Sequence, residues 1–499
     1  MYIFSAADIR AWDEYTILHE PISSIDLMER ASLACVDWLQ QHQPDNMGYA
    51  VFCGKGNNGG DGLAIARLLA EADHAVTVYI LEFGHLGTED FQTNLARLHE
   101  SGAVIKFISA AENIPTLTVG ETVIDALLGS GLNRPLEGLT AQVVGHINNS
   151  GLRVISIDMP TGLMADSSAT GNTIIQADHT LSFQCYKPAF LVAENAAYIG
   201  QLHILDIGLH PGYPATQPSP FQWIDQAMVQ SILRPRGAFS HKGTYGHAAI
   251  IAGSQGMMGA ATLAARACLR SGVGKLTAHI PAIGYTIMQI AVPEAMTYTA
   301  GKEHVETAVS LGQYDVIGAG PGLGQYGSHR ELLETIFQQC KNALVLDADA
   351  LNVLSLHQEL LGKLPPHTIL TPHPKEFERL FGKTANDFER IQLALKRAAA
   401  LKIVIVLKGR YSLVATPEGV AYFNSTGNPG MATGGSGDVL TGIITGLAAQ
   451  GYSPVHAAIA GVFIHGLAGD IAASYTSQTS LIASDLVEYL ADAFHQLEL

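Results

Sequence analysis

Short, continuously apolar runs alternate along the first part of the chain with segments whose apolar positions recur every three or four residues. The runs predict β-strands at residues 49–53, 76–81, 122–124 and 153–157, and the periodic segment at 62–72 predicts a helix. Strands that are apolar at every position are typical of parallel sheets covered on both faces. Each run leads into a loop rich in Gly, Pro or Asp, at the sheet edge where ligands bind.

The same alternation restarts after a segment crowded with prolines. The clustered prolines Pro211, Pro214, Pro218 and Pro220 indicate a linker over residues 208–220. Beyond it the pattern predicts a helix at 259–271 and an antiparallel hairpin of 413–416 with 420–423. Further strands are expected at residues 248–252, 275–280, 316–319, 343–346, 368–370 and 403–407.

Two α/β domains follow from this pattern. We divide the chain into an N-terminal domain at 1–210, a linker region at 211–225 and a C-terminal domain at 226–499. Apolar helices near residues 459–467 are expected to be exposed and to form an interface in a homo-oligomer.

Composition narrows the function classes. The 499 residues carry 28 basic and 45 acidic side chains, and the net charge of −17 argues against general affinity for nucleic acid or anionic membranes. No signal pattern opens the chain, and no uninterrupted apolar run reaches transmembrane length. The five cysteines are scattered without a CxxC pair, which favours a reducing compartment. We therefore expect a cytoplasmic protein.

The first glycine-rich loop, GKGNNGGDG at 54–62, allows three interpretations. Gly54, Gly56 and Gly59 after a strand, with Glu82 closing the next one, match a dinucleotide-binding pattern and hence an oxidoreductase. However, Asp61 would repel a pyrophosphate at the start of the helix. Asn58 and nearby carboxylates suit a small cation with a polar ligand, since hard cations prefer oxygen ligands. A tight turn without any ligand is the third possibility.

Two aspartates stand at the ends of later strands of the same domain. Asp125 precedes ALLGSG, and Asp158 precedes MPTGL. A single aspartate in such a place is often only a helix cap. Two of them beside a polar glycine loop predict a site in which a cation is bound and one carboxylate remains free for proton transfer.

These motifs, together with LMERA at 27–31, resemble the NAD(P)HX epimerase family. That family has a Rossmann-like fold and interconverts the R and S forms of hydrated NAD(P)H. The resemblance implies that Asp158 is the acid/base at C6 and that Asn58, Asp125 and Thr161 hold K⁺, although members often have serine at the last position. The residues implied to contact the hydrated nucleotide are Asn57, Asn58, Gly59, Gly60, Asp61, Gly129, Ser130, Gly131, Leu132, Asn133, Arg134, Pro135 and Asp158.

The C-terminal half contains several polar strand exits and one long glycine-rich motif. The motif GNPGMATGGSGD at 427–438 precedes a predicted helix, whose free N–H groups and dipole suit an anion such as phosphate. Asp438 would repel a phosphate unless it accepts a proton from an attacking hydroxyl. No GxxxxGKS or GxxxxGKT sequence and no protein-kinase signature is present, so a P-loop is excluded.

These segments resemble the ribokinase-like superfamily, and more closely the NAD(P)HX dehydratase family. The match extends from about His241 to Ala468 and includes GPGLG, DADALN, TPHPKEFERL, LKG and GNPGMATGGSGDVLTG. The resemblance implies that Ala260, Gly322, His373 and Asp438 contact the hydrated cofactor. It implies that the adenine nucleotide and its migrating phosphoryl group are bound by Lys408, Gly409, Arg410, Tyr411, Ser412, Gly434, Gly435, Ser436 and Gly437.

The mechanism implied by the resemblance begins with Asp438, which deprotonates the C6 hydroxyl of the S hydrate. ADP then phosphorylates this hydroxyl, and elimination of phosphate restores NADH or NADPH and leaves AMP. ADP rather than ATP follows from the fused architecture, and Mg²⁺ is expected to balance the charge of the nucleotide.

The leading interpretation is a bifunctional repair enzyme, an isomerase and a lyase, with NADHX and NADPHX as substrates. An ordinary kinase of vitamin or hydroxymethyl substrates would use the same Asp438. An NAD-dependent oxidoreductase could instead be built on the first glycine loop, and the chain could also be a non-catalytic nucleotide-binding scaffold. The three aspartates Asp125, Asp158 and Asp438 argue against the scaffold.

Overall fold

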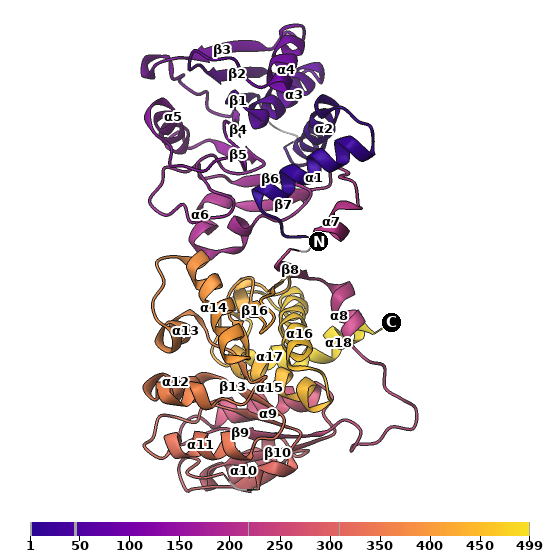
Figure 1. Ribbon diagram of the computed structural model, residues 1–499, viewed down its shortest axis with the longest axis vertical. Coiled ribbons are helices and arrows are strands. Elements are labelled where there is room, and N and C mark those ends of the chain that lie inside the picture. Colours follow the sequence, from indigo (N-terminus) through magenta and orange to yellow (C-terminus); the bar gives the residue numbers. More distant parts are fainter. Residues whose placement is uncertain (1, 44–46, 218, 309, 499) are drawn as a thin grey trace. The chain divides into compact units, whose positions relative to one another are not determined.

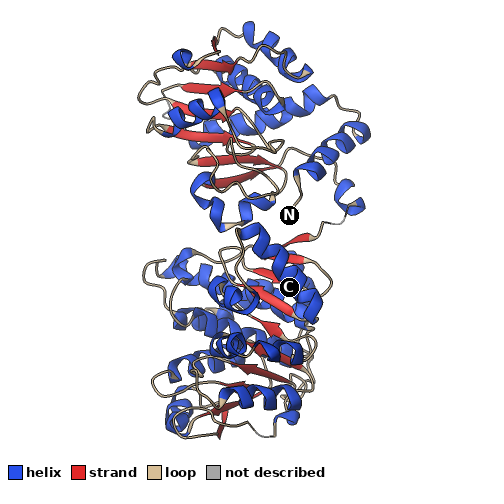
Figure 2. Cartoon of the chain, turned by 60° about the vertical axis from the view of Figure 1, so that its left-hand side comes forward, coloured by secondary structure: helices blue, strands red, loops and turns tan. Residues whose placement is uncertain are grey.

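The computed structural model describes residues 2–43, 47–217, 219–308 and 310–498 of the chain (Figure 1). These residues form two compact units, one of Met1–Ser219 with Asn386–Phe388 and one of Pro220–Ala385 with Glu389–Leu499. Each unit contains one sheet with helices packed against it (Figure 2). The predicted α/β fold class is confirmed.

The first unit is built on a seven-stranded sheet in the order β3-β2-β1-β4-β5-β6-β7, in which every pair is parallel. The strands are β1 (Tyr49–Cys53), β2 (Val76–Leu81), β3 (Val104–Ile108), β4 (Thr122–Ala126), β5 (Arg153–Ile157), β6 (His179–Phe183) and β7 (Gln201–Leu205). The strand order reverses between β1 and β4, which opens a crevice at their carboxyl ends. The sequence pattern did not predict β3, β6 or β7.

Helices cover both faces of this sheet. They are α1 (Ala6–His19), α2 (Ser24–His42), α3 (Asn57–Glu71), α4 (Glu89–His99), α5 (Gly138–Asn148), α6 (Ala196–Ile199) and α7 (Tyr213–Thr216), with 3₁₀ turns η1 (Ala111–Asn113), η2 (Pro188–Leu191) and η3 (Ala193–Asn195). α2, α3 and α4 share one hydrophobic core with the sheet, whereas α5 packs in a second core on strand residues of opposite parity, such as Ala50 and Phe52. This alternation follows from the two-residue period of a strand.

Helix α3 begins at Asn57, five positions before the predicted start at residue 62. The glycines that made this stretch look like a loop are required by close packing. A Cβ added at Gly59 would lie 1.9 Å from the carbonyl oxygen of Gly54. The helix can therefore start directly above the end of β1; its first turn carries Asn57 and Asn58, and Asp61 follows in the next turn.

The second unit has a ten-stranded sheet in the order β11-β10-β9-β12-β13-β14-β15-β16-β17-β8. Its strands are β8 (Phe221–Ile224), β9 (His247–Ile251), β10 (Lys275–Ile280), β11 (Met296–Thr299), β12 (Val316–Ala319), β13 (Ala343–Leu346), β14 (Ile369–Leu370), β15 (Val404–Leu407), β16 (Leu413–Ala415) and β17 (Ala421–Asn424). The predicted hairpin is confirmed, because β16 pairs antiparallel with β17.

Two long helices occupy the centre of the second unit's main core. Ile443 in α15 and Ile464 in α16 are both fully buried there. The helices are α8 (Gln226–Ile232), α9 (Met258–Arg270), α10 (Tyr285–Ala291), α11 (His329–Gln339), α12 (Ala348–Leu356), α13 (Pro374–Phe381), α14 (Asp387–Leu401), α15 (Ser436–Ala449), α16 (Pro454–Tyr475), α17 (Ala483–Glu488) and α18 (Leu490–Leu497), with 3₁₀ turns η4 (Ala282–Gly284), η5 (Leu311–Gln313), η6 (Gln358–Lys363) and η7 (Pro429–Met431).

The expectation that residues 459–467 are exposed is wrong. From Ile459 to Ile464 every residue is buried, because α16 packs against α15 and α18 inside the unit. Among the described residues α16 is also the one helix long and apolar enough to cross a membrane by length and composition. However, 72% of its apolar window is buried, as in the core helix of a globular fold.

The predicted linker region also contains regular structure. Phe221–Ile224 forms β8, which pairs in parallel with β17 and so belongs to the second sheet. α7 occupies Tyr213–Thr216, while Pro218 lies outside the described residues. The prolines around β8 made this segment look like a linker. The local sequence did not reveal β8, because the strand is formed by pairing with β17, which lies far along the chain.

Candidate active sites

The crevice at the carboxyl edge of the first sheet opens into a cavity of about 1480 Å³. This volume exceeds the roughly 300–1,000 Å³ typical of pockets for drug-sized ligands, so the cavity has room for a nucleotide. The predicted contact residues on its wall are Asn57, Asn58, Asp61, Gly129, Ser130, Gly131, Leu132, Asn133, Arg134, Pro135 and Asp158. Gly59 and Gly60 are buried within α3 and do not belong to the wall. Gly59 lets the helix approach the end of β1, and Gly60 lets it approach Met28 of α2.

Asp158 forms a buried ion pair that the sequence motifs did not reveal. Its Oδ1 lies 2.8 Å from Nζ of Lys187, whose side chain is fully buried, and its Oδ2 accepts a hydrogen bond from the backbone N–H of Ser130 at 2.9 Å. Burial alone would raise the pKa of Asp158, but the Lys187 ammonium and Ser130 lower it below the usual value. The carboxylate is therefore ionised and suited to accept a proton.

The backbone at Asp158 is held in an uncommon conformation. Its φ is +64°, in the left-handed region that few non-glycine residues occupy. Such conformations often mark functional sites, where the surrounding structure offsets a cost of order 1–3 kcal/mol.

The three residues implied for K⁺ gather around Leu128 and Gly129. Thr161 donates to Asp125 through both its hydroxyl, at 2.6 Å, and its backbone N–H, at 2.9 Å. A Cβ at Gly129 would lie 3.2 Å from Cγ of Asn58. Both polar atoms of the Asn58 amide are buried and have no hydrogen-bond partner within the described part of the chain. Such a group normally has one, so an oxygen-seeking ligand fits here.

In the second unit, Gly322 and Ala260, two of the residues implied to contact the substrate, lie close together although they follow different strands. Gly322 follows β12 and has a φ of +59°. A Cβ there would lie 3.0 Å from Cβ of Ala260 and 2.6 Å from the carbonyl oxygen of Met257. The hydroxyl of the buried Ser254 donates to the Gly322 carbonyl at 2.8 Å and joins the two loops.

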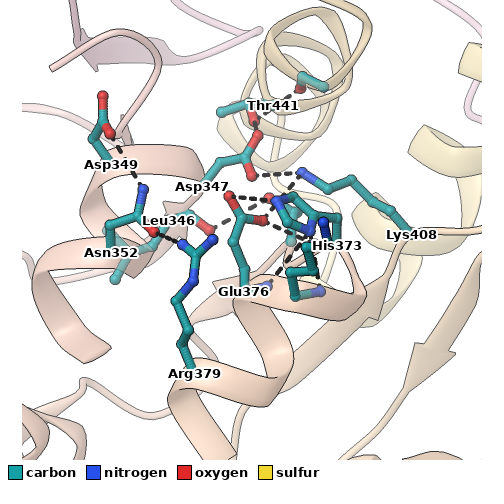
Figure 3. A network of polar contacts seen from close by, with 12 residues as sticks. Leu346, Asp347, Asp349, Asn352, His373, Glu376, Arg379, Lys408 and Thr441 are labelled. Atoms are coloured by element: carbon teal, nitrogen blue, oxygen red, sulfur yellow. Dashed lines mark hydrogen bonds and ion pairs between the residues drawn. The ribbon is translucent and has the colours of Figure 1, made fainter. Parts of the chain in front are cut away.

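A partly buried ion pair joins Lys408 to Asp347, beside Thr441 of α15 (Figure 3). Nζ of Lys408 is 2.8 Å from Oδ1 of Asp347, whose Oδ2 accepts a hydrogen bond from the hydroxyl of Thr441 at 2.6 Å. Burial alone would lower the pKa of Lys408, but Asp347 and Glu376, at 3.9 Å, raise it. The ammonium is held near the start of α15, since a Cβ on Gly437 would be 3.3 Å away.

Asp438 lies in the first turn of α15 and has no hydrogen-bond or ion-pair partner among the described residues. Burial, followed by repulsion from Asp347, raises its pKa to about 7, while Lys408 opposes the shift. A carboxyl with this pKa can accept and release a proton near neutral pH. The N–H groups of Gly434, Gly435, Ser436 and Gly437 surround the same helix start, which is suited to an anion.

His373 acts in the structure as the N-cap of α13. Its Nδ1 accepts from the backbone N–H of Lys375 at 3.1 Å and of Glu376 at 3.4 Å. Burial and then the Lys408 charge lower the pKa of the ring. His373 is therefore neutral, and its partly exposed ring remains available for hydrogen bonding or stacking.

The segment after Lys408 forms a compact turn. The hydroxyl of Ser412 donates to the Gly409 carbonyl at 3.2 Å, and the Arg410 guanidinium donates to the Gly427 carbonyl at 2.7 Å. The Tyr411 ring lies 5.7 Å from the Trp223 ring of β8. The hydrogen bond from Arg410 thus connects this turn to the motif that begins at Gly427.

Sequence reasoning did not assign a role to Lys187, Asp347, Glu376 or Thr441. Lys187 lies 29 positions after Asp158, so no local spacing connects them. Asp347 could have been identified from the sequence, because it stands at the end of a predicted strand, as Asp125 and Asp158 do.

Two family models match separate parts of the chain. The model described as YjeF-related protein N-terminus matches residues 24–189, and the model described as NAD(P)H-hydrate dehydratase matches residues 248–492. Together the two matched ranges contain all the residues that the sequence motifs assigned to the two sites.

Solved structures resemble the C-terminal half. A ribokinase-like superfamily protein from Enterococcus faecalis V583 is 27% identical, with a TM-score of 0.51, and the match covers 56% of this chain and 98% of that one. The ADP/ATP-dependent NAD(P)H-hydrate dehydratase from Bacillus subtilis, co-crystallised with ATP and Mg²⁺, is 34% identical, with a TM-score of 0.49, and covers 56% of this chain and 99% of that one.

Full-length relatives match both halves at once. The bifunctional NAD(P)H-hydrate repair enzyme of Moorella thermoacetica is 36% identical over 100% of this chain and 97% of its own. The corresponding enzyme of Escherichia coli K12 is 33% identical over 98% of this chain and 93% of its own. With both domains, in the same order and over the whole length, the chain belongs to the family of bifunctional NAD(P)H-hydrate repair enzymes.

Proposed function

We propose that this chain epimerises R- and S-NAD(P)HX and dehydrates the S form to NAD(P)H with ADP, releasing AMP and phosphate. The observation that carries the proposal is Asp438, which is unpartnered among the described residues at a helix start beside a buried ammonium, in a chain 36% identical end to end to a bifunctional repair enzyme. We assign epimerisation to residues 1–210 and dehydration to 226–499, with 211–225 as the connecting region.

Dehydration requires a better leaving group than hydroxide. Asp438 takes the proton of the C6 hydroxyl, and the hydroxyl oxygen attacks the β-phosphorus of ADP while AMP departs. The N–H groups of residues 434–437 and the Lys408 ammonium would stabilise charge on the transferred phosphoryl group. The C6–O bond then breaks with departure of phosphate, and loss of a C5 proton gives the dihydronicotinamide. Ala260, Gly322 and His373 would position the hydrated ring.

The turn from Lys408 to Ser412, with Gly434 to Gly437, would bind the adenine nucleotide. Support comes from the Bacillus subtilis relative, which is named ADP/ATP-dependent and was crystallised with ATP and Mg²⁺. We choose ADP because the two domains are fused. No cluster of three or more His, Cys, Asp or Glu suited to a metal occurs among the described residues, so Mg²⁺ is expected to be held largely by nucleotide phosphates.

In the N-terminal site, Asp158 would accept or return a proton during inversion at C6. The Lys187 ammonium keeps it ionised. Asn58, Asp125 and Thr161 would hold K⁺, which when bound supplies a fixed positive charge beside the nucleotide. The unpaired, buried amide of Asn58 supports a ligand there.

A cytoplasmic homo-oligomer without nucleic-acid or membrane partners completes the proposal. The net charge of −17 supports the absence of polyanionic partners. All five cysteines lie within the described residues and are free thiols, which agrees with a reducing compartment.

The decisive experiment follows reduced-nicotinamide absorbance with mixed R- and S-NADHX, ADP, Mg²⁺ and K⁺. Complete recovery of NADH with stoichiometric AMP is expected. We expect Asp438→Ala to abolish dehydration with epimerisation intact, and Asp158→Asn to stop recovery at the S fraction. Dehydration that persists in Asp438→Ala would remove the assigned base.

The same experiment distinguishes the competing functions. Phosphorylated product that accumulates without elimination would favour an ordinary kinase. An absorbance change that needs a separate reducible substrate would favour an oxidoreductase built on Gly54, Gly56, Gly59 and Glu82. Binding without turnover would favour a scaffold.

A further inference from the structure

Helix α1 brings the carboxyl group of Asp13 to the wall of the N-terminal cavity, which Asp61 and Asp158 also line. The helix is firmly placed, because Ser5 and Asp8 form a capping box at its start and Trp12 is buried beside Asp13. Among the described residues the Asp13 side chain has neither a hydrogen bond nor an ion pair. Keeping the charge of a half-buried carboxylate without a partner costs free energy. A carboxyl group in this situation that faces a cavity is therefore a candidate for a chemical role.

The charges around Asp13 come from several elements. Arg10 and Glu14 lie on α1 itself, Asp158 and Lys187 come from the loops after β5 and β6, and Asp61 and the thiol of Cys185 also interact with Asp13. Burial, and then Asp158, raises the pKa of Asp13 to about 7, while Lys187 and Arg10 oppose the shift.

Among the carboxyl groups that line the cavity, Asp13 and Asp158 are therefore in opposite states. Asp158 is paired with Lys187 and stays ionised, whereas Asp13 retains its proton up to neutral pH. Two titratable groups whose surroundings push their pKa values apart are the usual arrangement of an acid and a base.

Inversion at C6 of the hydrated ring needs such a pair. If the C6–O bond breaks and re-forms on the other face, the departing hydroxyl must be protonated, because hydroxide leaves poorly. The incoming water must in turn lose a proton. One carboxylate alone performs only one of these tasks at a time.

We propose that Asp13 is the general acid of the epimerase site and works together with Asp158 as the base. This inference rests on the proposed epimerase function. The Asp13 proton goes to the C6 hydroxyl, the C6–O electron pair leaves with the water, and the N1 lone pair forms the N1=C6 bond. Water then adds to the opposite face of C6 and gives its proton to Asp158. The reverse reaction exchanges the two roles, and proton exchange with solvent restores the starting state.

The test measures conversion of purified R-NADHX by the full chain and by three variants. Asp13→Asn should lower the epimerisation rate at least about 100-fold, as expected for loss of a general acid. Asp13→Glu, which keeps the carboxyl group, should restore a measurable part of the rate. Asp37→Asn removes an exposed aspartate of α2 outside the cavity and should change nothing. ADP-dependent dehydration of S-NADHX should be equal in all three variants, which controls for the amount of protein with an intact second unit, while the activity of Asp13→Glu controls for folding of the first unit.

Two further measurements report on the proton of Asp13 and on the origin of the oxygen at C6. For the unmodified chain, kcat/KM for epimerisation should fall as pH rises above about 7, where Asp13 loses its proton. In ¹⁸O-labelled water, the S product should gain ¹⁸O at C6 faster than an enzyme-free control.

The outcomes are distinguishable. If the unmodified chain does not epimerise R-NADHX, the proposed function itself fails. If it does, an unchanged rate in Asp13→Asn, or product formed without ¹⁸O, overturns the role of Asp13.

Discussion

Asp158 and Asp438, the two aspartates assigned to catalysis, occupy opposite electrostatic environments. Asp158 is paired with the fully buried Lys187, which lowers its pKa, while Lys408, whose charge acts on Asp438, is already paired with Asp347. Asp438 is consequently the group whose pKa is raised to about 7. At neutral pH the resting state of the first residue is a carboxylate, whereas the second titrates in this range.

The raised pKa of Asp438 predicts a dependence of stability on pH. The folded state holds this proton more tightly than the unfolded chain, so the stabilisation is complete below pH 3.8 and is lost as pH rises through about 7. A shift of this size corresponds to at most about 4 kcal/mol. Asp438→Asn should therefore unfold at a higher temperature than the unmodified protein at pH 8, but not near pH 4, while dehydration is lost. Thermal unfolding of both proteins at the two pH values tests this expectation, and a gain that is equal at both would contradict it.

At the scale of elements, both sites use the first turn of a helix that follows a glycine-rich segment. The first turn of α3 presents Asn57 and Asn58 to the N-terminal cavity, with Asp61 in the turn that follows, and the first turn of α15 presents Asp438. In α3 the glycines serve mainly to bring the helix close to the sheet. The chemistry is thus placed by packing of the helix rather than by a mobile loop.

Two glycine-to-alanine substitutions within helices test this role. In α3, Gly59→Ala adds a Cβ only 1.9 Å from the Gly54 carbonyl oxygen and must displace the helix start. We expect a loss of about 1–3 kcal/mol in unfolding free energy and of epimerisation. In α5, the Cβ of Gly145→Ala meets nothing within 4 Å, so a gain of roughly 0.5–1 kcal/mol is expected. Denaturant unfolding of both variants provides the comparison, and equal effects would refute the packing argument.

At the scale of the whole molecule, each unit has its own sheet, hydrophobic core and site. The residues assigned to epimerisation all lie in the first unit, and those assigned to dehydration all lie in the second. Neither set needs a side chain from the other unit.

This separation predicts that the activities can be supplied by different chains. Asp158→Asn is expected to retain only the dehydratase activity and Asp438→Ala only the epimerase activity. An equimolar mixture should recover all NADH from mixed R- and S-NADHX, because the S form can diffuse from one protein to the other. The absorbance endpoint of the mixture, compared with each variant alone, is the measurement. Recovery limited to the S fraction would show that both sites must be intact in one chain.

Much of this architecture could be predicted from the sequence. The strand predictions at 49–53 and 275–280 have the same bounds as β1 and β10, because continuous apolar runs identify buried parallel strands. β3 was missed because it lies at the sheet edge and exposes most of its residues. The exposure expected at residues 459–467 was wrong because composition alone does not distinguish an interface from a core.

The sequence by itself determined the two α/β domains, their order, the family and the strand-end aspartates, because these depend on local patterns and on contiguous motifs. Only the tertiary structure decided which groups face these aspartates. It paired Asp158 with Lys187, Asp347 with Lys408, and brought Asp13 of α1 to the same cavity as Asp158. Protonation depends on burial and on charges within a few ångströms, and such neighbours are far apart in the sequence.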